Sequence, residues 1–345
     1  MNEHAYASER DMKVAVIDRP GDPCSLTIYA ENVISRLTAS GVAMALLRKP
    51  WTIPSDCEIV WDPGLCMRRI PSVLKNPPCP VVGTIHGVKT FSLPLEEIAS
   101  KEEPVEELAV LHSGVKADWE WFAASVSRIV AVSHYAARET MDAFALGTDL
   151  VRVAYLGVDR HIFYELGSAF PHPRPYLLHV SAAPNPIKNV DRLIAAFARD
   201  ALWRFCDLVI VMPGYRGRTH PKGVSFVTHR MQQHMLAKWY RGALALVFPS
   251  IRETFGLPIV EAMACGCPVI TSDSTGCAEV AGNAAILVTP RCINSIAIGM
   301  SRIVTNPTLR CSLRALGLKR ARQFTWEKHA DFMLKVFREA SMRRM

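Results

Sequence analysis

Short apolar runs alternate with helix-length amphipathic segments along the whole chain. In the first half, runs rich in β-branched residues lie at 14–17, 43–47, 58–61, 81–85, 129–132 and 151–154. The same pattern restarts in the second half, at 176–180, 208–212, 224–227, 245–248, 268–270 and 286–288. Runs of this length, separated by helical segments, are typical of βαβ units with a parallel sheet. The pattern predicts an α/β protein with two Rossmann-like, doubly wound domains.

A turn-rich passage separates the two repeats of this pattern. It follows Asp159 and contains Gly167, Pro171, Pro173 and Pro175. Proline stiffens a segment and prevents regular strand pairing, so this passage reads as a linker. We therefore expect a first domain over residues 1–165 and a second over 166–329.

The last segment carries apolar residues at helical spacing from Trp326 to Phe337. Such spacing gives a helix one apolar face, and we expect the C-terminal helix, residues 330–345, to pack back on the first domain. Two smaller signals are structural: Ser133 reads as a helix N-cap and Gly157 as a turn residue. Because doubly wound sheets bind ligands beyond the carboxyl ends of their strands, we place the site in a cleft where the two domains face each other.

Composition narrows the class of protein. The chain has 345 residues, of which half are hydrophobic, which suits two globular domains better than one. Its net charge of +8 favours anionic partners, and we expect a nucleotide rather than nucleic acid. Ten scattered cysteines lack a CxxC pair and read as reduced thiols. No signal peptide or membrane-length apolar window is present, so we expect a cytoplasmic protein, with peripheral association at the inner face of the membrane left open.

The segment ALVFPSIRETFGLPIVEAMACGCPV runs from a strand through a polar loop into a helix. The free N–H groups of Phe255, Gly256 and Leu257 would lie at the start of that helix, where they and the helix dipole favour an anion such as a diphosphate. Glu253 and Glu261 stand eight residues apart, and carboxylates accept hydrogen bonds from sugar hydroxyls. The alternative interpretation is that both glutamates are ordinary solvated charges.

The same segment resembles glycosyltransferase family 4, whose members carry E-(G/S/T)-F-G-L-P-x-x-E-A-M-A-x-G-x-P-V; here it reads ETFGLPIVEAMACGCPV. The resemblance implies the GT-B fold and a retaining transfer from a nucleotide-diphosphate sugar without a metal. It implies that the first domain binds the acceptor and that the second binds the nucleotide sugar. It implies that Glu253 contacts the hydroxyls of the donor sugar and that Glu261 contacts the nucleotide ribose. Thr254 and the amides that follow it are expected to complete the donor loop.

Two further segments resemble the same family. In HVSAAPNPIKNVDRLIAAFA, Lys188 matches a basic residue that opens a helix, and a lysine there would stabilise the charge of the leaving pyrophosphate. In VVGTIHGV, His86 stands where relatives carry a histidine that faces the donor sugar. For a lone lysine or histidine, the alternative interpretation is a surface or core residue without a catalytic role.

The chain departs from the family pattern at two places. Ala183 and Ile187 occupy positions at which many relatives carry an arginine, so we expect either weaker neutralisation of the leaving-group charge or a contribution from Arg252 instead. Gly21 stands alone where relatives have a Gly-Gly loop near the acceptor or phosphate. Arg230, with His229, follows the run at 224–227 where relatives contact the base, but nothing in this loop chooses uracil, guanine or adenine.

We therefore expect a retaining hexosyltransferase that uses a UDP- or GDP-sugar. The acceptor is expected to be a polysaccharide, glycolipid or lipid-linked glycan precursor, with a small metabolite as an alternative. A catalytically silent GT-B protein that binds a sugar nucleotide is a second alternative, and a GT-B epimerase or phosphorylase is a third. We expect no cofactor and no metal, because no Asp-x-Asp pair follows a strand and no His/Cys cluster has ligand spacing. The absence of GxGxxG argues against a dinucleotide dehydrogenase.

Overall fold

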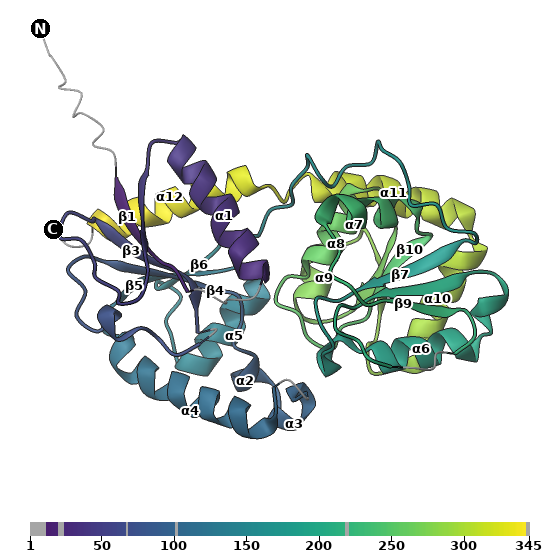
Figure 1. The fold of residues 1–345 in the computed structure, drawn as a ribbon, viewed down its shortest axis with the longest axis horizontal. Coiled ribbons are helices and arrows are strands. Elements are labelled where there is room, and N and C mark those ends of the chain that lie inside the picture. The colour runs from purple at the N-terminus through teal and green to yellow at the C-terminus, as the bar shows by residue number, and fades with distance from the viewer. Residues whose placement is uncertain (1–11, 20–23, 67, 101–102, 218–220, 343–345) are drawn as a thin grey trace, which may run out of the picture.

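The structure, a computed structural model, describes residues 12–19, 24–66, 68–100, 103–217 and 221–342. Two α/β domains lie side by side, each built on a six-stranded parallel sheet with helices on both faces (Figure 1). The prediction of two doubly wound domains is confirmed. No helix in the described part of the chain is long and apolar enough to cross a membrane.

The first sheet has the strand order β2-β1-β3-β4-β5-β6. Its strands are β1 (Lys13–Ile17), β2 (Ala43–Leu47), β3 (Ile59–Leu65), β4 (Val81–Ile85), β5 (Val126–Ala131) and β6 (Val151–Val153). The helices of this domain are α1 (Cys24–Ala39), α2 (Lys89–Ser92), α3 (Leu95–Ile98), α4 (Val105–Phe122) and α5 (His134–Phe144), with a 3-10 turn at Ser72–Leu74. Ser133 is the N-cap of α5, as predicted: its Oγ accepts a hydrogen bond from the Ala136 N–H at 2.9 Å.

The second sheet has the strand order β12-β11-β10-β7-β8-β9. Its strands are β7 (Tyr176–Val180), β8 (Asp207–Val211), β9 (Val224–Val227), β10 (Ala245–Phe248), β11 (Val269–Ser272) and β12 (Ile286–Val288). The helices are α6 (Val190–Arg199), α7 (Gln233–Gly242), α8 (Leu257–Ala264), α9 (Thr275–Ala281), α10 (Ile293–Thr305) and α11 (Pro307–Ala321), with 3-10 turns at Pro186–Lys188 and Leu202–Arg204.

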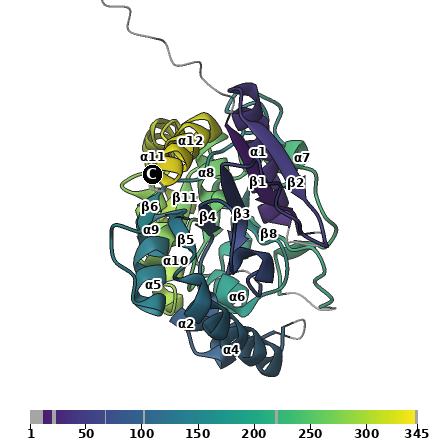
Figure 2. The ribbon, with the colours of Figure 1, turned by 90° about the vertical axis from the view of Figure 1, so that its left-hand side faces the viewer.

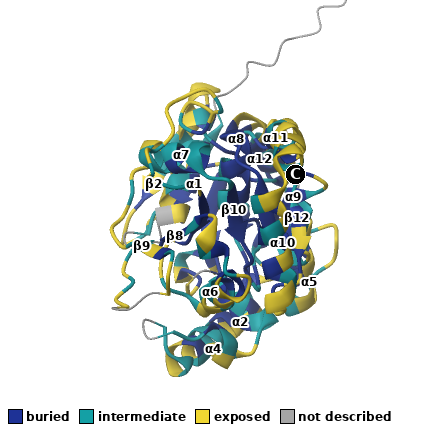
Figure 3. Ribbon diagram, turned by 90° about the vertical axis from the view of Figure 1, so that its right-hand side faces the viewer, coloured by how far each residue is buried: buried dark blue, intermediate teal, exposed yellow. Residues whose placement is uncertain are grey.

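Burial explains why these segments form strands. Each of the apolar runs predicted from the sequence overlaps a strand, and every residue of β3, β4, β7 and β10 is buried. Strands covered by helices on both faces need apolar side chains at successive positions, which is why they read as continuous runs. Figure 3 shows this buried interior around β10, enclosed by helices whose outer faces are exposed.

Strand order fixes where ligands can bind. In the first sheet, the chain passes from β1 to β2 on one side and to β3 on the other; in the second, β8 and β10 flank β7 in the same way. At such a switch point the loops that follow the two central strands diverge and leave room beyond the sheet edge. Residues that directly follow β1, β3, β7 and β10 are therefore the first to consider for a site.

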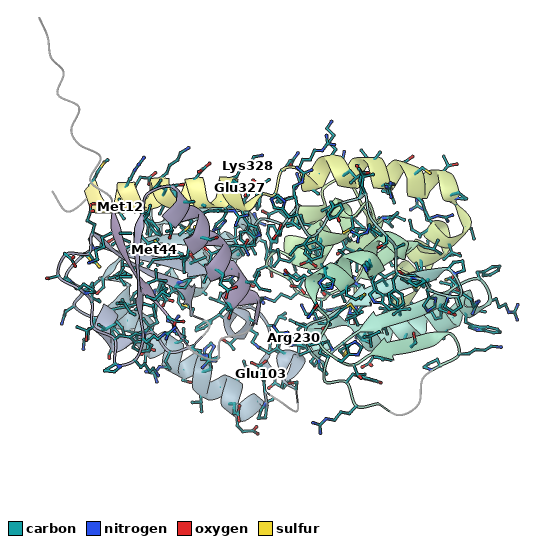
Figure 4. All side chains as sticks on the ribbon, turned by 45° about the horizontal axis from the view of Figure 1, so that its top comes forward. Met12, Met44, Glu103, Arg230, Glu327 and Lys328 are labelled. Carbon is teal, nitrogen blue, oxygen red and sulfur yellow. The ribbon has the colours of Figure 1, made fainter. Side chains whose placement is uncertain are left out.

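The C-terminal helix α12 (Trp326–Met342) lies on the first domain, next to α1 (Figure 1, Figure 2). It buries the face that carries Trp326, His329, Met333, Val336 and Phe337, while Glu327 and Lys328 project from its outer side (Figure 4). Gly157 lies against the start of α12, where an added Cβ would approach the Trp326 nitrogen to 2.2 Å. Two segments connect the domains, one after β6 and one before α12. Gly157 is required because these two segments pack closely against each other.

Candidate active site

Lys188 and Glu253 meet at the switch point of the second sheet. Lys188 ends the 3-10 turn that follows β7, and Glu253 lies in the loop between β10 and α8. The Lys188 ammonium forms an ion pair with the Glu253 carboxylate, and the two side chains are 21% and 14% exposed. The structure thus brings together the residues expected to take the pyrophosphate and the sugar hydroxyls.

Asn189 holds the Lys188 turn against the loop after β10. This residue has a positive φ of 63°, and its side-chain amide donates hydrogen bonds to the carbonyls of Pro249, at 2.9 Å, and Pro290, at 2.6 Å. The Ile251 N–H donates to the Ile187 carbonyl at 2.8 Å. Because Asn189 is buried, these bonds are shielded from water and fix the two loops relative to each other.

The start of α8 presents backbone amides toward the same loop. Gly256 is the N-cap, and its φ of 87° is one that residues other than glycine rarely adopt. Leu257 is the first helical residue, so its N–H and the preceding ones have no partner within the helix. The Phe255 side chain is buried between the rings of Tyr155 and Phe324, with centroids at 6.2 and 5.6 Å. Phe255 therefore offers a ligand its backbone rather than its ring.

Glu261 lies in the second turn of α8 and is held by Tyr240 of α7. The Tyr240 hydroxyl donates a hydrogen bond to Glu261 Oε2 at 2.9 Å. Burial raises the pKa of Glu261 to about 7, although the bond from Tyr240 opposes the shift. Near neutral pH this carboxyl therefore exchanges between an acid that can donate and a carboxylate that only accepts hydrogen bonds.

His86 follows β4 in the first domain and is a neutral imidazole. Burial lowers its pKa to about 4. Its Nε2 lies 3.1 Å from the Pro63 carbonyl, and since a carbonyl can only accept, Nε2 carries the proton. The other ring nitrogen, Nδ1, is then an acceptor for which the described residues offer no hydrogen bond. A sugar hydroxyl could donate to it.

Tyr29 of α1 supports the His86 ring through an edge-on contact, with ring centroids 4.6 Å apart. The Tyr29 hydroxyl lies 3.0 Å from Nε2 of His329 on α12 and 3.1 Å from the Thr84 hydroxyl. His329 is neutral because burial lowers its pKa to about 4, and its Nδ1–H donates to the Tyr155 carbonyl at 3.0 Å. Its Nε2 can then only accept, so Tyr29 donates to it. The C-terminal helix is thereby linked to the position of His86.

Thr254 connects the donor loop to the first domain. Its hydroxyl donates to the His86 carbonyl at 2.5 Å, and its own carbonyl accepts a hydrogen bond from the Ser133 hydroxyl at 2.5 Å. On α9, the Glu279 carboxylate accepts from the first two N–H groups of α5, at 2.7 and 2.8 Å. The predicted residues of the two domains therefore face one another across direct hydrogen bonds.

Arg252 is not directed toward an open surface. Its guanidinium makes a two-point ion pair with Glu139 of α5, with Nε 2.7 Å from Oε1, and the two side chains are only 7% and 4% exposed. In this state Glu139 neutralises the charge that the sequence analysis assigned to the leaving group. Neither Glu139 nor Glu279 was predicted, because an isolated glutamate on a helix carries no signal that distinguishes an interdomain partner from a solvated charge.

The first sheet also carries an ion pair that the sequence did not predict. Arg19 lies two residues after β1, and its Nη1 and Nη2 donate hydrogen bonds to the two carboxylate oxygens of Asp62 on β3, each at 2.5 Å. The two side chains are 7% and 0% exposed. Gly21 lies outside the described residues. Arg230 is exposed after β9 and projects near the border of the two domains in Figure 4. The base-binding role expected for Arg230 stays a prediction.

Two other features are separate from these residues. A surface hollow of about 190 Å³ is lined by residues of segment 160–166, of α8 and of α11, and by Arg322, which follows α11. None of the predicted site residues lines it. Among the described residues, no group of three or more His, Cys, Asp or Glu side chains is arranged to hold a metal ion.

Comparison with known proteins places the second domain in a family. The family described as glycosyl transferases group 1 matches residues 174–306. The chain is 30% identical over 163 residues to O-antigen chain mannosyltransferase B of Escherichia coli, covering 44% of this chain and 42% of that protein. It is 28% identical over 233 residues to the MMP alpha-(1→4)-mannosyltransferase of Mycolicibacterium hassiacum, covering 64% and 56%. The chain spans about half the length of these relatives.

Solved structures match over nearly the whole chain. Sucrose-phosphate synthase from Thermosynechococcus elongatus superimposes with a TM-score of 0.74 at 20% identity, covering 95% of this chain and 98% of that one. HepE from Anabaena, in complex with UDP and glucose, does so with a TM-score of 0.67 at 15% identity, covering 95% and 100%. At these identities the likeness establishes the fold. The chain has the GT-B fold, and its residues 174–306 match the glycosyl transferases group 1.

Proposed function

We propose that this protein is a retaining glycosyltransferase that moves a hexose from a nucleotide-diphosphate sugar to a glycan acceptor. The observation that carries the proposal is the partly exposed Lys188–Glu253 ion pair at the switch point of the second sheet, beside the free amides at the start of α8. A cation and backbone amides suit a diphosphate, and a carboxylate next to them suits sugar hydroxyls.

Donor binding would open the Lys188–Glu253 pair. Lys188 would then pair with the diphosphate, and Glu253 would accept hydrogen bonds from two neighbouring sugar hydroxyls. Glu261, at the far end of the site, would accept from the ribose, which favours its ionised form. From the first domain, His86 Nδ1 would accept a hydrogen bond from a hydroxyl of the same sugar.

The proposed transfer step is compatible with these roles. The acceptor hydroxyl attacks the anomeric carbon on the face from which the phosphate departs, the bond between that carbon and the phosphate oxygen breaks, and the hydroxyl proton passes to the departing oxygen. The products are the glycosylated acceptor and a nucleoside diphosphate, with the anomeric configuration retained. Lys188 and the amides of α8 would stabilise the negative charge that grows on the leaving group.

The comparisons support a choice of donors to test. Two relatives are named as mannosyltransferases, which supports a mannose donor, and the HepE structures hold UDP, which supports a uridine donor. We therefore propose GDP-mannose and UDP-glucose as the first candidates, with ADP-glucose as a comparison. The O-antigen relative supports a polysaccharide or lipid-linked acceptor, which would bring the protein to the inner face of the membrane.

Thermal unfolding with each nucleotide sugar tests the proposal, followed by release of nucleoside diphosphate with water as the acceptor. A true donor raises the unfolding temperature, because it binds only the folded state, and is hydrolysed slowly. Lack of both effects with all three donors would contradict the proposal. Protection without release would instead support the second candidate, a sugar-nucleotide binding protein, which is favoured by the capture of the Arg252 charge by Glu139.

A further inference from the structure

Glu139 contacts two loops that belong to different domains. Its Oε1 accepts a hydrogen bond from Arg252 Nε at 2.7 Å, and its Oε2 accepts from Arg252 Nη2 and from the Val88 N–H, the latter at 3.1 Å. Val88 lies two residues after His86, and Arg252 directly precedes Glu253. One carboxylate thus joins the loop that carries His86 to the loop that carries Glu253.

The two loops are tightly packed around this carboxylate. Gly87 has a φ of 134°, and an added Cβ there would lie 2.5 Å from Thr254 Cγ2 and 3.0 Å from Arg252 Nη2. Glu139 itself is fixed by its helix, because the N-cap of α5, Ser133, donates a hydrogen bond to the Thr254 carbonyl. The position of Glu139 is therefore set from both domains, and it has little freedom to follow one loop without the other.

The charge on Glu139 is maintained although the side chain is buried. Burial by itself raises the pKa of Glu139, but the hydrogen bonds and charge of Arg252 outweigh that effect and bring the pKa below its ordinary value. A buried ion pair gains little net stability, because taking both charges out of water offsets their attraction. What such a pair does provide is a strict geometric requirement, since separating the two side chains leaves each buried charge without its ion-pair partner.

We propose that Glu139 is a positioning residue for glycosyl transfer, which sets the distance between the His86 and Glu253 loops by bonding to both. The inference rests on the proposed function. It predicts that loss of the Glu139 charge impairs turnover, for which residues of both domains must meet one sugar. Affinity for a nucleoside diphosphate should persist, because Lys188, Glu261 and the α8 amides all belong to the second domain.

The decisive variant is Glu139→Gln, which keeps the size of the side chain. We expect kcat for nucleoside diphosphate release from UDP-glucose or GDP-mannose to fall about 100-fold, the effect of a misplacement of about 1 Å in a reacting group. Calorimetric affinity for UDP or GDP should be unchanged. Amide hydrogen exchange should become faster in both loops, residues 86–88 and 251–256, although the substitution lies outside each of them.

Asp118 offers a matched control inside the first domain. Like Glu139, it bonds to an arginine at two points, Arg69 at 2.6 and 2.7 Å, and to a backbone N–H, that of Ile70 at 2.9 Å. Asp118→Asn therefore removes the charge of a buried carboxylate with the same kinds of partner, one of them the more exposed Arg69, without touching either loop. We expect it to leave kcat and exchange in both loops at wild-type values below its unfolding temperature. The exposed interdomain pair Arg291–Glu97 offers a second control, Glu97→Gln, with the same expectation.

The outcomes separate the inference from the function. If the wild type turns over a donor but Glu139→Gln retains wild-type kcat, or loses no more than Asp118→Asn does, the positioning role is wrong and the function stands. If the wild type releases no nucleoside diphosphate from any donor, the proposed function fails, and hydrogen exchange alone decides on the Glu139 link. Faster exchange confined to residues 86–88 would then overturn it.

Discussion

Each domain places an ion pair at the switch point of its sheet, and the two pairs differ in burial. In the first domain, Arg19 and Asp62 are 7% and 0% exposed and share two hydrogen bonds. In the second, Lys188 and Glu253 are 21% and 14% exposed and share one. The same topological position therefore holds one pair that is sealed from ligands and one that a ligand can reach.

The difference indicates separate roles for the two pairs. Water can solvate Lys188 and Glu253 when a ligand separates them, so the cost of opening that pair is low. Separating Arg19 from Asp62 would break a two-point ion pair between two buried charges, which is far more costly. We infer that the first pair shapes the edge of its sheet and that the second is available for binding.

The largest expected effect is on stability, for Asp62→Asn. The substitution leaves Arg19 buried with half of its partner, and we expect the free energy of unfolding to fall by about 3–5 kcal/mol. Urea denaturation followed by circular dichroism measures it. The exposed pair between Lys13 and Asp56 supplies the control, Asp56→Asn, which should change little. Equal effects of the two substitutions would remove the distinction between buried and exposed pairs.

Next in size is the loss of turnover in Lys188→Ala. We expect kcat to fall about 10²–10³-fold, as when one group that stabilises a leaving group is removed, while the unfolding temperature stays near the wild-type value. Glu253→Ala should likewise abolish transfer with the fold intact. Initial rates of nucleoside diphosphate release measure both. Lys222, an exposed lysine of the same domain that packs on Trp203, gives the control Lys222→Ala. Near-wild-type turnover in Lys188→Ala would exclude its pyrophosphate role.

The sequence predicted the second domain in more detail than the first. Two segments that resemble one family, ETFGLPIVEAMACGCPV and HVSAAPNPIKNVDRLIAAFA, carried that prediction, together with the expected start of a helix at Phe255 to Leu257. Because Lys188 and Glu253 follow the strands at the switch point, strand order alone brings their loops together. Their mutual ion pair was still not predicted, since it depends on side-chain rotamers.

Contacts between distant segments could not be derived in this way. Glu139 bonds to Arg252 over 113 positions, and Tyr29 to His329 over 300. Neither pairing has a periodicity or spacing that would reveal it. The same limit applies to Arg252, which sequence reasoning assigned to the leaving group because its neighbours in the chain belong to the donor loop, whereas its partner belongs to the other domain.

A smaller effect is expected for His86→Ala, which should reduce kcat more than nucleotide affinity. The loss should be about tenfold, the value of one neutral hydrogen bond to the sugar. Tyr29→Phe is the matched comparison, because it keeps the ring contact with His86 and removes only the hydroxyl that bonds to His329. We expect it to lower stability by about 1 kcal/mol and to preserve turnover. An unchanged rate in His86→Ala would return His86 to a structural role.

The smallest effect is a pH dependence of nucleotide binding that originates in Glu261. Its pKa in the folded protein is about 7, above the ordinary value of 4.5, so the folded state binds this proton more tightly than the unfolded state. Stability of the unliganded protein should therefore fall as pH rises from about 4.5 to 7 and then level off. The ribose hydroxyls need the carboxylate, so affinity for UDP or GDP should rise through the upper part of this range.

Calorimetry with UDP and GDP at pH 6, 7 and 8 measures the effect, with Glu261→Gln as the comparison. The variant should bind more weakly above pH 7 and show a flatter dependence on pH, because its amide does not titrate. If wild type and variant titrate in parallel, the ribose role of Glu261 is wrong, and the carboxyl serves only to anchor Tyr240 between α7 and α8.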